Sequence, residues 1–282
     1  MDEPRLEAFA QAMAASGLNV LTPELPDIKD YRVSEANIRA IGSSATWFAQ
    51  QRGAPMGVMG LSFSGGLALV AAANPTYAPS MKFVFAVGSQ GAMTRVAAYY
   101  RTGSDPRPDG TVEVLPAHEY GPLVLEYEHI DEFVPRADLT AIRNVLRAHL
   151  YEDKQTEDDA IKQLNRRQAD EAKHLMDAAS DATHTLLLTS EQKHQAEMQQ
   201  LSPDAHLHDL TVPVFLLHGE ADNIIPAAET LWMASQLRAE YLQASLVSPM
   251  LSHLDMNKEP SLGDQWRLIH FMGKVLRMAH QN

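Results

Sequence analysis

The sequence predicts an α/β fold built on a mostly parallel sheet that is flanked by helices. Short, continuously apolar segments, such as residues 56–61, 82–88 and 244–248, alternate with segments whose apolar residues recur at helical spacing. Continuous apolar strands suit a parallel sheet that is buried on both faces. The alternation stops near residue 94 and returns near residue 206, which predicts a first core part (1–93), a helical insertion (94–205) and a second core part (206–282).

The first core part begins with a predicted helix over residues 4–16, ended by Gly17. A strand is expected over Leu18–Thr22, because the prolines that follow would end it. The next predicted helix is capped by Ser34 and ended by Gly53. The last helix of the chain is expected over residues 262–278.

The insertion shows no strand-like apolar run. Its charged, helix-patterned stretches predict helices over residues 138–151 and 156–179, and turn-forming residues predict a loop over residues 102–110. The acidic residues between 152 and 159 fit a solvated helix N-terminus better than a metal site.

Composition limits the classes of function. The 282 residues carry a formal net charge of −13 and a pI near 5.3, and most of such a surface would repel nucleic acid or an anionic membrane. We therefore expect a small-molecule partner, no nucleic acid and no membrane. The chain has no cysteine, which excludes thiolate chemistry, and nothing in it indicates a cofactor or a metal. Without a membrane-length apolar run or a signal-peptide pattern, the expected location is cytoplasmic.

The segment from Met56 to Ala73 is typical of a strand, a sharp turn and a helix around Ser62. In such a nucleophile elbow the serine occupies a strained turn above the sheet. The residues two positions before and after it must be small, so that the strand and helix backbones can approach. Gly60 and Ser64 fill these positions. Ser64 is the rival nucleophile, but the length of the preceding strand favours Ser62.

A serine hydroxyl needs a base to accept its proton and a carboxylate to hold that base in the correct tautomer. Asp222 and His253 follow two successive strand-like segments, so both are expected in loops at the sheet edge that the serine turn also faces. We therefore expect Ser62 to be the nucleophile, His253 the base and Asp222 the acid. Glu220 or Glu229 could supply the carboxylate instead.

The order of these three residues, with an insertion between the core strands, resembles the α/β-hydrolase superfamily of serine hydrolases. The resemblance covers residues 1–93 and about 206–282. Residues 218–226 (HGEADNIIP) match the family's His-Gly-x-x-Asp-x-x-x-Pro loop. The resemblance implies that the insertion is a helical cap and that the backbone N–H of Phe63 contributes to an oxyanion hole.

The start of the chain departs from this family. The second oxyanion donor of α/β-hydrolases comes from a loop, often beginning His-Gly, that precedes the first helix. Residues 1–5 contain neither that loop nor the strand expected beside the elbow strand. We expect a longer active protein, and we expect the chain as written to be weakly active, unstable or a homodimer formed through open sheet edges.

The resemblance predicts a serine hydrolase that cleaves a small carboxylic ester, thioester or amide through an acyl-serine intermediate. Two alternatives stay open: an acyltransferase with the same triad, and a non-catalytic ligand-binding protein of the same fold. His206 and His208 have a spacing seen in metal sites but are expected in a surface loop. The residues of the insertion that are candidates to line the pocket are Tyr99, Tyr100, Tyr120, Tyr127, Phe133 and Met176.

Overall fold

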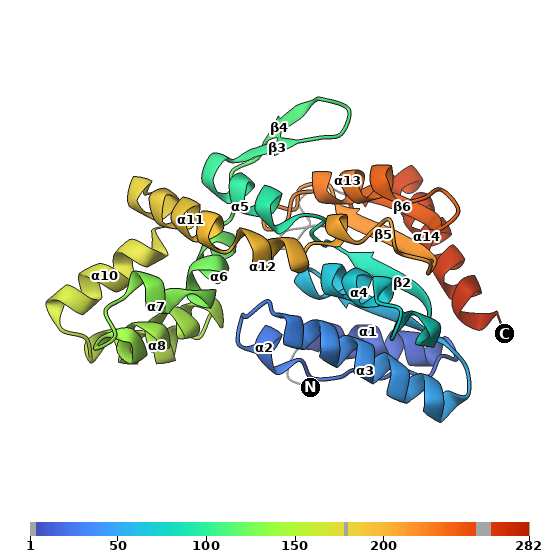
Figure 1. Cartoon of the computed structure of the whole chain (residues 1–282), viewed down its shortest axis with the longest axis horizontal. Helices are drawn as coiled ribbons and strands as arrows, with labels where there is room; N and C mark the ends of the chain where they lie inside the picture. The colour runs from blue at the N-terminus through green and yellow to red at the C-terminus, as the bar shows by residue number, and fades with distance from the viewer. Residues whose placement is uncertain (1–3, 178–179, 252–260, 282) are drawn as a thin grey trace.

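One parallel sheet of four strands is the centre of the fold in the computed structural model, which describes residues 4–177, 180–251 and 261–281 (Figure 1). The strands are, in spatial order, β1 (Met56–Leu61), β2 (Met81–Val87), β5 (Val214–Gly219) and β6 (Leu242–Ser248). All the pairings between them are parallel, so their carboxyl ends lie along one edge. The parallel sheet predicted from the sequence is confirmed.

The two central strands are the most buried part of the sheet. Every residue of β5 is buried, and so are most residues of β2. Because successive residues of a strand point to opposite faces, the two strands supply two separate apolar clusters. The larger cluster contains Val84 and Leu216, and the smaller one contains Phe83 and Phe215. Burial on both faces explains why these strands are continuously apolar in sequence.

Helices cover both faces of this sheet. The helices α3 (Glu35–Arg52) and α4 (Phe63–Ala73) contribute to the larger cluster, and α14 (Leu262–His280) contributes Phe271 and Val275 to the smaller one. α13 (Ala228–Gln236) follows β5. No helix among the described residues combines the length and apolar character needed to cross a lipid bilayer.

The N-terminal segment corrects one prediction. The helix expected at the start forms α1 (Pro4–Ala15), but the strand expected over Leu18–Thr22 does not form. Residues 18–25 have no regular structure, and the side chains of Val20 and Leu21 are 42% and 38% exposed. A β-favouring sequence becomes a strand only beside a partner that satisfies its backbone groups, and the described part of the chain offers this segment none.

β1 lies at one edge of the sheet. β2 pairs with one of its sides, and no strand of the described residues pairs with the other. Its last residue, Leu61, is 41% exposed. The backbone groups along the outer side of β1 therefore have no partner strand within residues 4–177, 180–251 and 261–281.

The part of the chain between the two core parts is mainly helical, and most of its helices gather at one end of the molecule (Figure 1). Its helices are α5 (Met93–Thr102), α6 (Tyr120–Glu128), α7 (Ile130–Phe133), α8 (Leu139–Leu150), α9 (Lys154–Lys162), α10 (Arg166–Met176), α11 (Asp181–Lys193) and α12 (Gln195–Gln200). Their apolar residues join the same large cluster as the core helices. The domain boundaries at 94 and 205 stay a prediction.

Two local expectations for this region were wrong. Residues 102–110 were expected to form a loop, but they contribute to a hairpin of β3 (Ser104–Pro106) and β4 (Val112–Val114). The single helix expected over residues 156–179 is interrupted. The side chain of Asn165 accepts the Gln168 N–H and the side chain of Gln168 accepts the Asn165 N–H, which starts α10 as a new helix.

Glu126 of α6 is a buried acid. Its side chain is fully buried, and neither carboxylate oxygen has a hydrogen-bond partner within the described residues. Burial raises the pKa of Glu126 to about 8, because the charged form would lose its hydration. The folded protein therefore holds Glu126 protonated at neutral pH.

We predict that Glu126→Gln makes the free energy of unfolding less dependent on pH. The unfolded chain releases the Glu126 proton near the ordinary pKa of 4.5, whereas the folded chain keeps it up to about pH 8. Between these values, rising pH favours unfolding by up to about 1.4 kcal/mol per unit. Urea unfolding at pH 5 and pH 8 measures the difference. The exposed Glu220→Gln is the control. Equal pH slopes for wild type and Glu126→Gln would contradict the prediction.

Candidate active site

Ser62 occupies the turn between β1 and α4 with a strained backbone. Its φ of 54° and ψ of −137° lie in a region that non-glycine residues rarely adopt. Its N–H donates to the Val87 carbonyl at 2.8 Å, which fixes the turn to the end of the neighbouring strand. Such strain persists only where the surrounding structure imposes it, and at a serine it is typical of a nucleophile elbow.

Two glycines make this turn sterically allowed. A Cβ atom on Gly60 would lie 2.4 Å from the Gly65 Cα atom. A Cβ atom on Gly65 would lie 2.0 Å from the Ser89 Oγ atom and 2.8 Å from the Gly60 carbonyl oxygen. The strand and the helix therefore approach so closely that no larger residue fits at either position.

The structure separates the two candidate nucleophiles. The Ser64 hydroxyl donates to the Leu61 carbonyl at 2.6 Å, and its oxygen also lies 3.0 Å from the Leu61 N–H. Ser64 therefore closes the turn. The Ser62 hydroxyl caps no backbone N–H of α4 and is half-buried. This arrangement agrees with the choice of Ser62.

Asp222 lies in the loop that follows β5, at the same sheet edge as Ser62. Its carboxylate is buried, and one oxygen accepts the N–H groups of Ile224 and Ile225, each at 3.0 Å. These two bonds hold the loop in a tight turn. The prediction that Asp222 lies in a loop at this edge agrees with the structure, and its role as the catalytic acid stays a prediction.

His218, at the end of β5, has a structural role. Its side chain is fully buried, with Nε2 at 2.8 Å from the Ile225 carbonyl and Nδ1 at 2.8 Å from the Thr230 hydroxyl. A carbonyl only accepts, so Nε2 donates to Ile225; it also lies 3.5 Å from the Asp222 Oδ2 atom. Both ring nitrogens are thus used to fix the Asp222 loop to α13.

The two alternative carboxylates are less suitable. Glu229 accepts the N–H groups of Gly91 and Ala92 at 2.8 and 2.7 Å and pairs with Arg95 at 2.7 Å. It therefore joins the loop after β2 to α13. Glu220 is exposed to solvent.

The predicted base, His253, lies outside the described residues, so its meeting with Ser62 and Asp222 stays a prediction. The described chain before it turns toward the Asp222 loop. A Cβ atom on Gly219 would lie 2.3 Å from the Leu251 carbonyl oxygen, so the segment leaving β6 passes closely over the end of β5.

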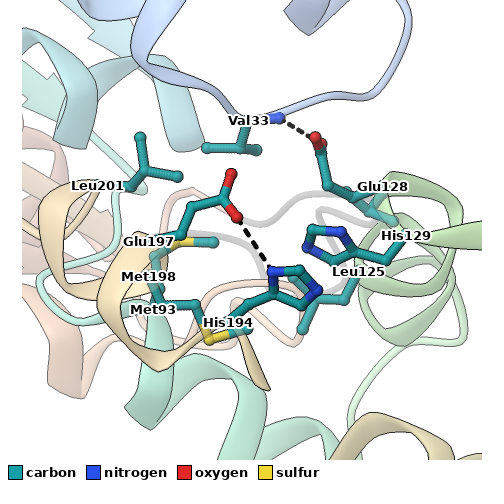
Figure 2. A pocket seen from close by; sticks show the side chains of 10 residues that line it. Val33, Met93, Leu125, Glu128, His129, His194, Glu197, Met198 and Leu201 are labelled. Carbon is teal, nitrogen blue, oxygen red and sulfur yellow. Dashed lines mark hydrogen bonds and ion pairs between the residues drawn. The ribbon is translucent and has the colours of Figure 1, made fainter. Parts of the chain in front are cut away.

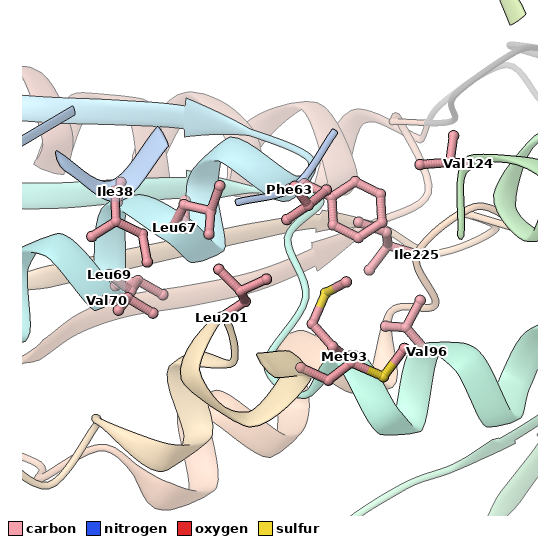
Figure 3. Close-up of a cluster of buried hydrophobic side chains, with 14 of the residues drawn as sticks. Ile38, Phe63, Leu67, Leu69, Val70, Met93, Val96, Val124, Leu201 and Ile225 are labelled. Atoms are coloured by element: carbon pink, nitrogen blue, oxygen red, sulfur yellow. The ribbon is translucent and has the colours of Figure 1, made fainter. Parts of the chain in front are cut away.

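The backbone N–H of Phe63 begins α4 and donates no backbone hydrogen bond within the described residues. It is one of the open donors of a helix N-terminus, where partial positive charge gathers. The Phe63 side chain is buried in the large apolar cluster that also contains Met93 and Val124 (Figure 3).

The residues proposed to line a pocket are mostly packed in the core. Tyr99, Tyr100 and Tyr127 are buried, and the other three, Tyr120, Phe133 and Met176, are partly buried against the same cluster. None of the six lines the cavity beside His129 and His194 or the cavity between β6 and α14. Burial, together with the nearby Asp222 charge, raises the pKa of Tyr100.

His206 and His208 lie in turns at the surface, as expected from the sequence: His206 bonds the Gln200 carbonyl and His208 lies beside Asp209. A different group, His129, His194 and Glu197, does come together. Sequence reasoning missed it because its members come from different helix junctions and only the last two share a short spacing.

The parallel sheet, the helices on both faces and the strained serine turn together define an α/β-hydrolase enzyme. The Peptidase S15 family model, described as X-Pro dipeptidyl-peptidase (S15 family), matches residues 45–253, well over half of the chain. The chain belongs to this family. No curated protein matches the sequence significantly.

Solved structures of hydrolases resemble the chain only weakly. An α/β hydrolase enzyme, MGS-M2, from a Medee basin deep-sea metagenome library is 13% identical, with a TM-score of 0.36 over 83% of this chain and 71% of that one. A serine hydrolase from Cycloclasticus zankles is 12% identical, with a TM-score of 0.40 over 87% and 72%. An esterase from Exiguobacterium antarcticum is 13% identical, with a TM-score of 0.40 over 88% and 75%.

We predict that Gly65→Ala destabilises the protein by about 1–3 kcal/mol, because its Cβ atom would collide with Ser89 and with the strand backbone. Gly273→Ala is the matched control. It lies in α14 with open space around it and should stabilise by about 0.5–1 kcal/mol. Thermal unfolding of both variants tests this. A Gly65→Ala variant as stable as Gly273→Ala would show that β1 and α4 are not packed so closely.

Proposed function

We propose that the protein is a serine hydrolase that cleaves a carboxylic ester, thioester or amide through an acyl-serine intermediate. Ser62 is the nucleophile, His253 the base and Asp222 the acid. The observation that carries the proposal is the strained backbone of Ser62 at the start of α4, because it exposes a hydroxyl directly beside an open helix N-terminus.

The path of the chain supports the role of His253. Parallel strands lie about 4.8 Å apart, so β5 lies roughly 10 Å from β1, where Ser62 is found. The Leu251 carbonyl already packs on Gly219 at the end of β5. Two further extended residues span up to about 7 Å, and the imidazole adds its own length. A histidine at position 253 is therefore within reach of both Asp222 and Ser62.

In the proposed reaction His253 accepts the Ser62 proton while the serine oxygen attacks the carbonyl carbon of the substrate. The negative charge on the carbonyl oxygen is stabilised by the Phe63 N–H at the positive end of α4. His253 then protonates the leaving group, and a water molecule activated by His253 releases the acyl group from Ser62. Asp222 holds the imidazole in the required tautomer.

The description of the matched family favours one amide substrate class. Because the family model is that of X-Pro dipeptidyl-peptidases, a peptide bond that follows proline is the first amide to test beside simple esters. An acyltransferase would use the same residues, with an alcohol or amine in place of water in the last step. Product analysis with and without added acceptor distinguishes the two.

We predict that a fluorophosphonate probe labels the wild-type chain and the Ser64→Ala variant but not Ser62→Ala. The probe reacts only with a serine that a base activates. Intact-protein mass spectrometry measures the added mass. Ser64→Ala is the matched control, since it removes a hydroxyl two residues away. Labelling that persists in Ser62→Ala would contradict the assignment, and absence of labelling in the wild type would favour a ligand-binding protein.

We predict that His253→Ala and Asp222→Asn each lower kcat for a nitrophenyl ester or an X-Pro nitroanilide by about 10³-fold or more. Asparagine keeps the oxygen that accepts the Ile224 and Ile225 N–H groups, so the loop should remain folded. Glu220→Gln, in the same loop, is the control and should leave kcat unchanged. An unchanged rate in either triad variant would assign that role to another residue.

A further inference from the structure

A group of metal-ligating side chains lies where four helices meet. His129 stands between α6 and α7, His194 stands between α11 and α12, and Glu197 lies in the first turn of α12. These junctions are distant in sequence but face one another in the fold (Figure 2). All three side chains are partly buried.

The three residues are close enough to share one ion. A ligand atom from each lies within 4.8 Å of the other two. The rings of His129 and His194 stack with their centroids 3.6 Å apart, and His194 Nδ1 lies 3.2 Å from Glu197 Oε2. Tetrahedral ligands of zinc lie about 3.3 Å from one another. Because the stacked rings are nearly parallel, with 6° between their planes, at least one ring must rotate about its side-chain bonds to turn its lone pair toward a shared ion.

A second carboxylate orients the His194 ring. Glu132 Oε1 lies 3.0 Å from His194 Nε2 and also pairs with Lys193. His194 Nε2 can donate its proton to Glu132. Nδ1 then either carries a second proton and donates to Glu197, or is unprotonated and shares a cation with the Glu197 carboxylate. A histidine that donates one nitrogen to a carboxylate and presents the other to a metal is a common arrangement in metal sites.

The surroundings favour a cation. The three residues line a cavity of about 30 Å³, which is enough for an ion with a bound water. Glu128 adds another carboxylate to its wall, and neither lysine nor arginine lines it. The rest of the wall is apolar and includes Met93 and Leu201, which would limit the access of bulk water. The ring nitrogens of His129 form no hydrogen bond among the described residues, and only its carbonyl accepts one, from the Glu132 N–H, so the nitrogens are available as ligands.

We propose that His129, His194 and Glu197 bind one zinc-type divalent cation, with a water molecule as the fourth ligand. Two imidazoles and a carboxylate suit zinc, cobalt or nickel and do not suit calcium or magnesium, which prefer oxygen ligands alone. The ion fastens the α6–α7 junction to the α11–α12 junction. It thereby stabilises the helical part of the chain, whose Met93 and Val124 belong to the same apolar cluster as Phe63.

The test is zinc binding by the full chain after removal of metal with EDTA. We predict that it binds one equivalent of Zn²⁺ in competition with a chelating dye, and that zinc raises the temperature of unfolding. His129→Ala and Glu197→Gln should each weaken the binding by about 100-fold or more. Glu132→Gln should weaken it about 10–100-fold, because only the orientation of His194 is lost.

His208→Ala is the matched control, since it removes an exposed imidazole outside the cluster. It should bind zinc like the wild type. Circular dichroism of each metal-free variant shows whether the fold is retained, and Co²⁺ provides a second reading, because a tetrahedral site with nitrogen ligands gives intense visible absorption. Absence of stoichiometric binding by the wild type, or binding that survives both His129→Ala and Glu197→Gln, would overturn the proposal and leave an ordinary ion-pair network.

Discussion

The close approach of β1 and α4 at the Ser62 turn is the constraint on which the candidate site depends. The glycines at positions 60 and 65 allow the backbones to touch, and the Ser64 hydroxyl closes the turn between them. Strain at Ser62 is therefore held by its surroundings. Because the strands are parallel, the carboxyl ends of the neighbouring strands lie at the same sheet edge as this turn. The contact between β1 and α4 therefore positions the Ser62 hydroxyl and the N-terminus of α4 at the edge where the Asp222 loop also lies.

The strands and the serine turn were predicted well, because each depends on the pattern of residues close together in the sequence. The buried strands β2 and β5 are continuously apolar, and parallel pairing follows from the helices between them. The elbow was visible because small residues flank Ser62 at fixed positions. Asp222 was predicted from its place directly after a buried strand; the structure bears out that position, and its catalytic role stays a prediction. His253 rests on the same argument and lies outside the described residues.

The parts that the sequence did not predict depend on distant partners or on competing local bonds. Val20 and Leu21 favour a strand, but a strand needs a neighbour that local sequence does not specify. Asn165 and Gln168 form a capping box inside a continuous helical pattern, a signal that was present in the sequence. The sequence around His129 or His194 does not indicate that the two rings stack, because the contact arises from the packing of two helix junctions that are distant in sequence.

The unpaired outer side of β1 has a consequence for how the protein behaves during refolding. Within the described residues its backbone groups have no partner strand, and an exposed edge accepts any extended peptide that it encounters. Closing the fold is a first-order process, whereas capture of a second molecule is second order in protein. We therefore expect dilution to raise the yield of correctly folded chains, because pairing of two molecules along β1, which ends one residue before Ser62, depends on protein concentration.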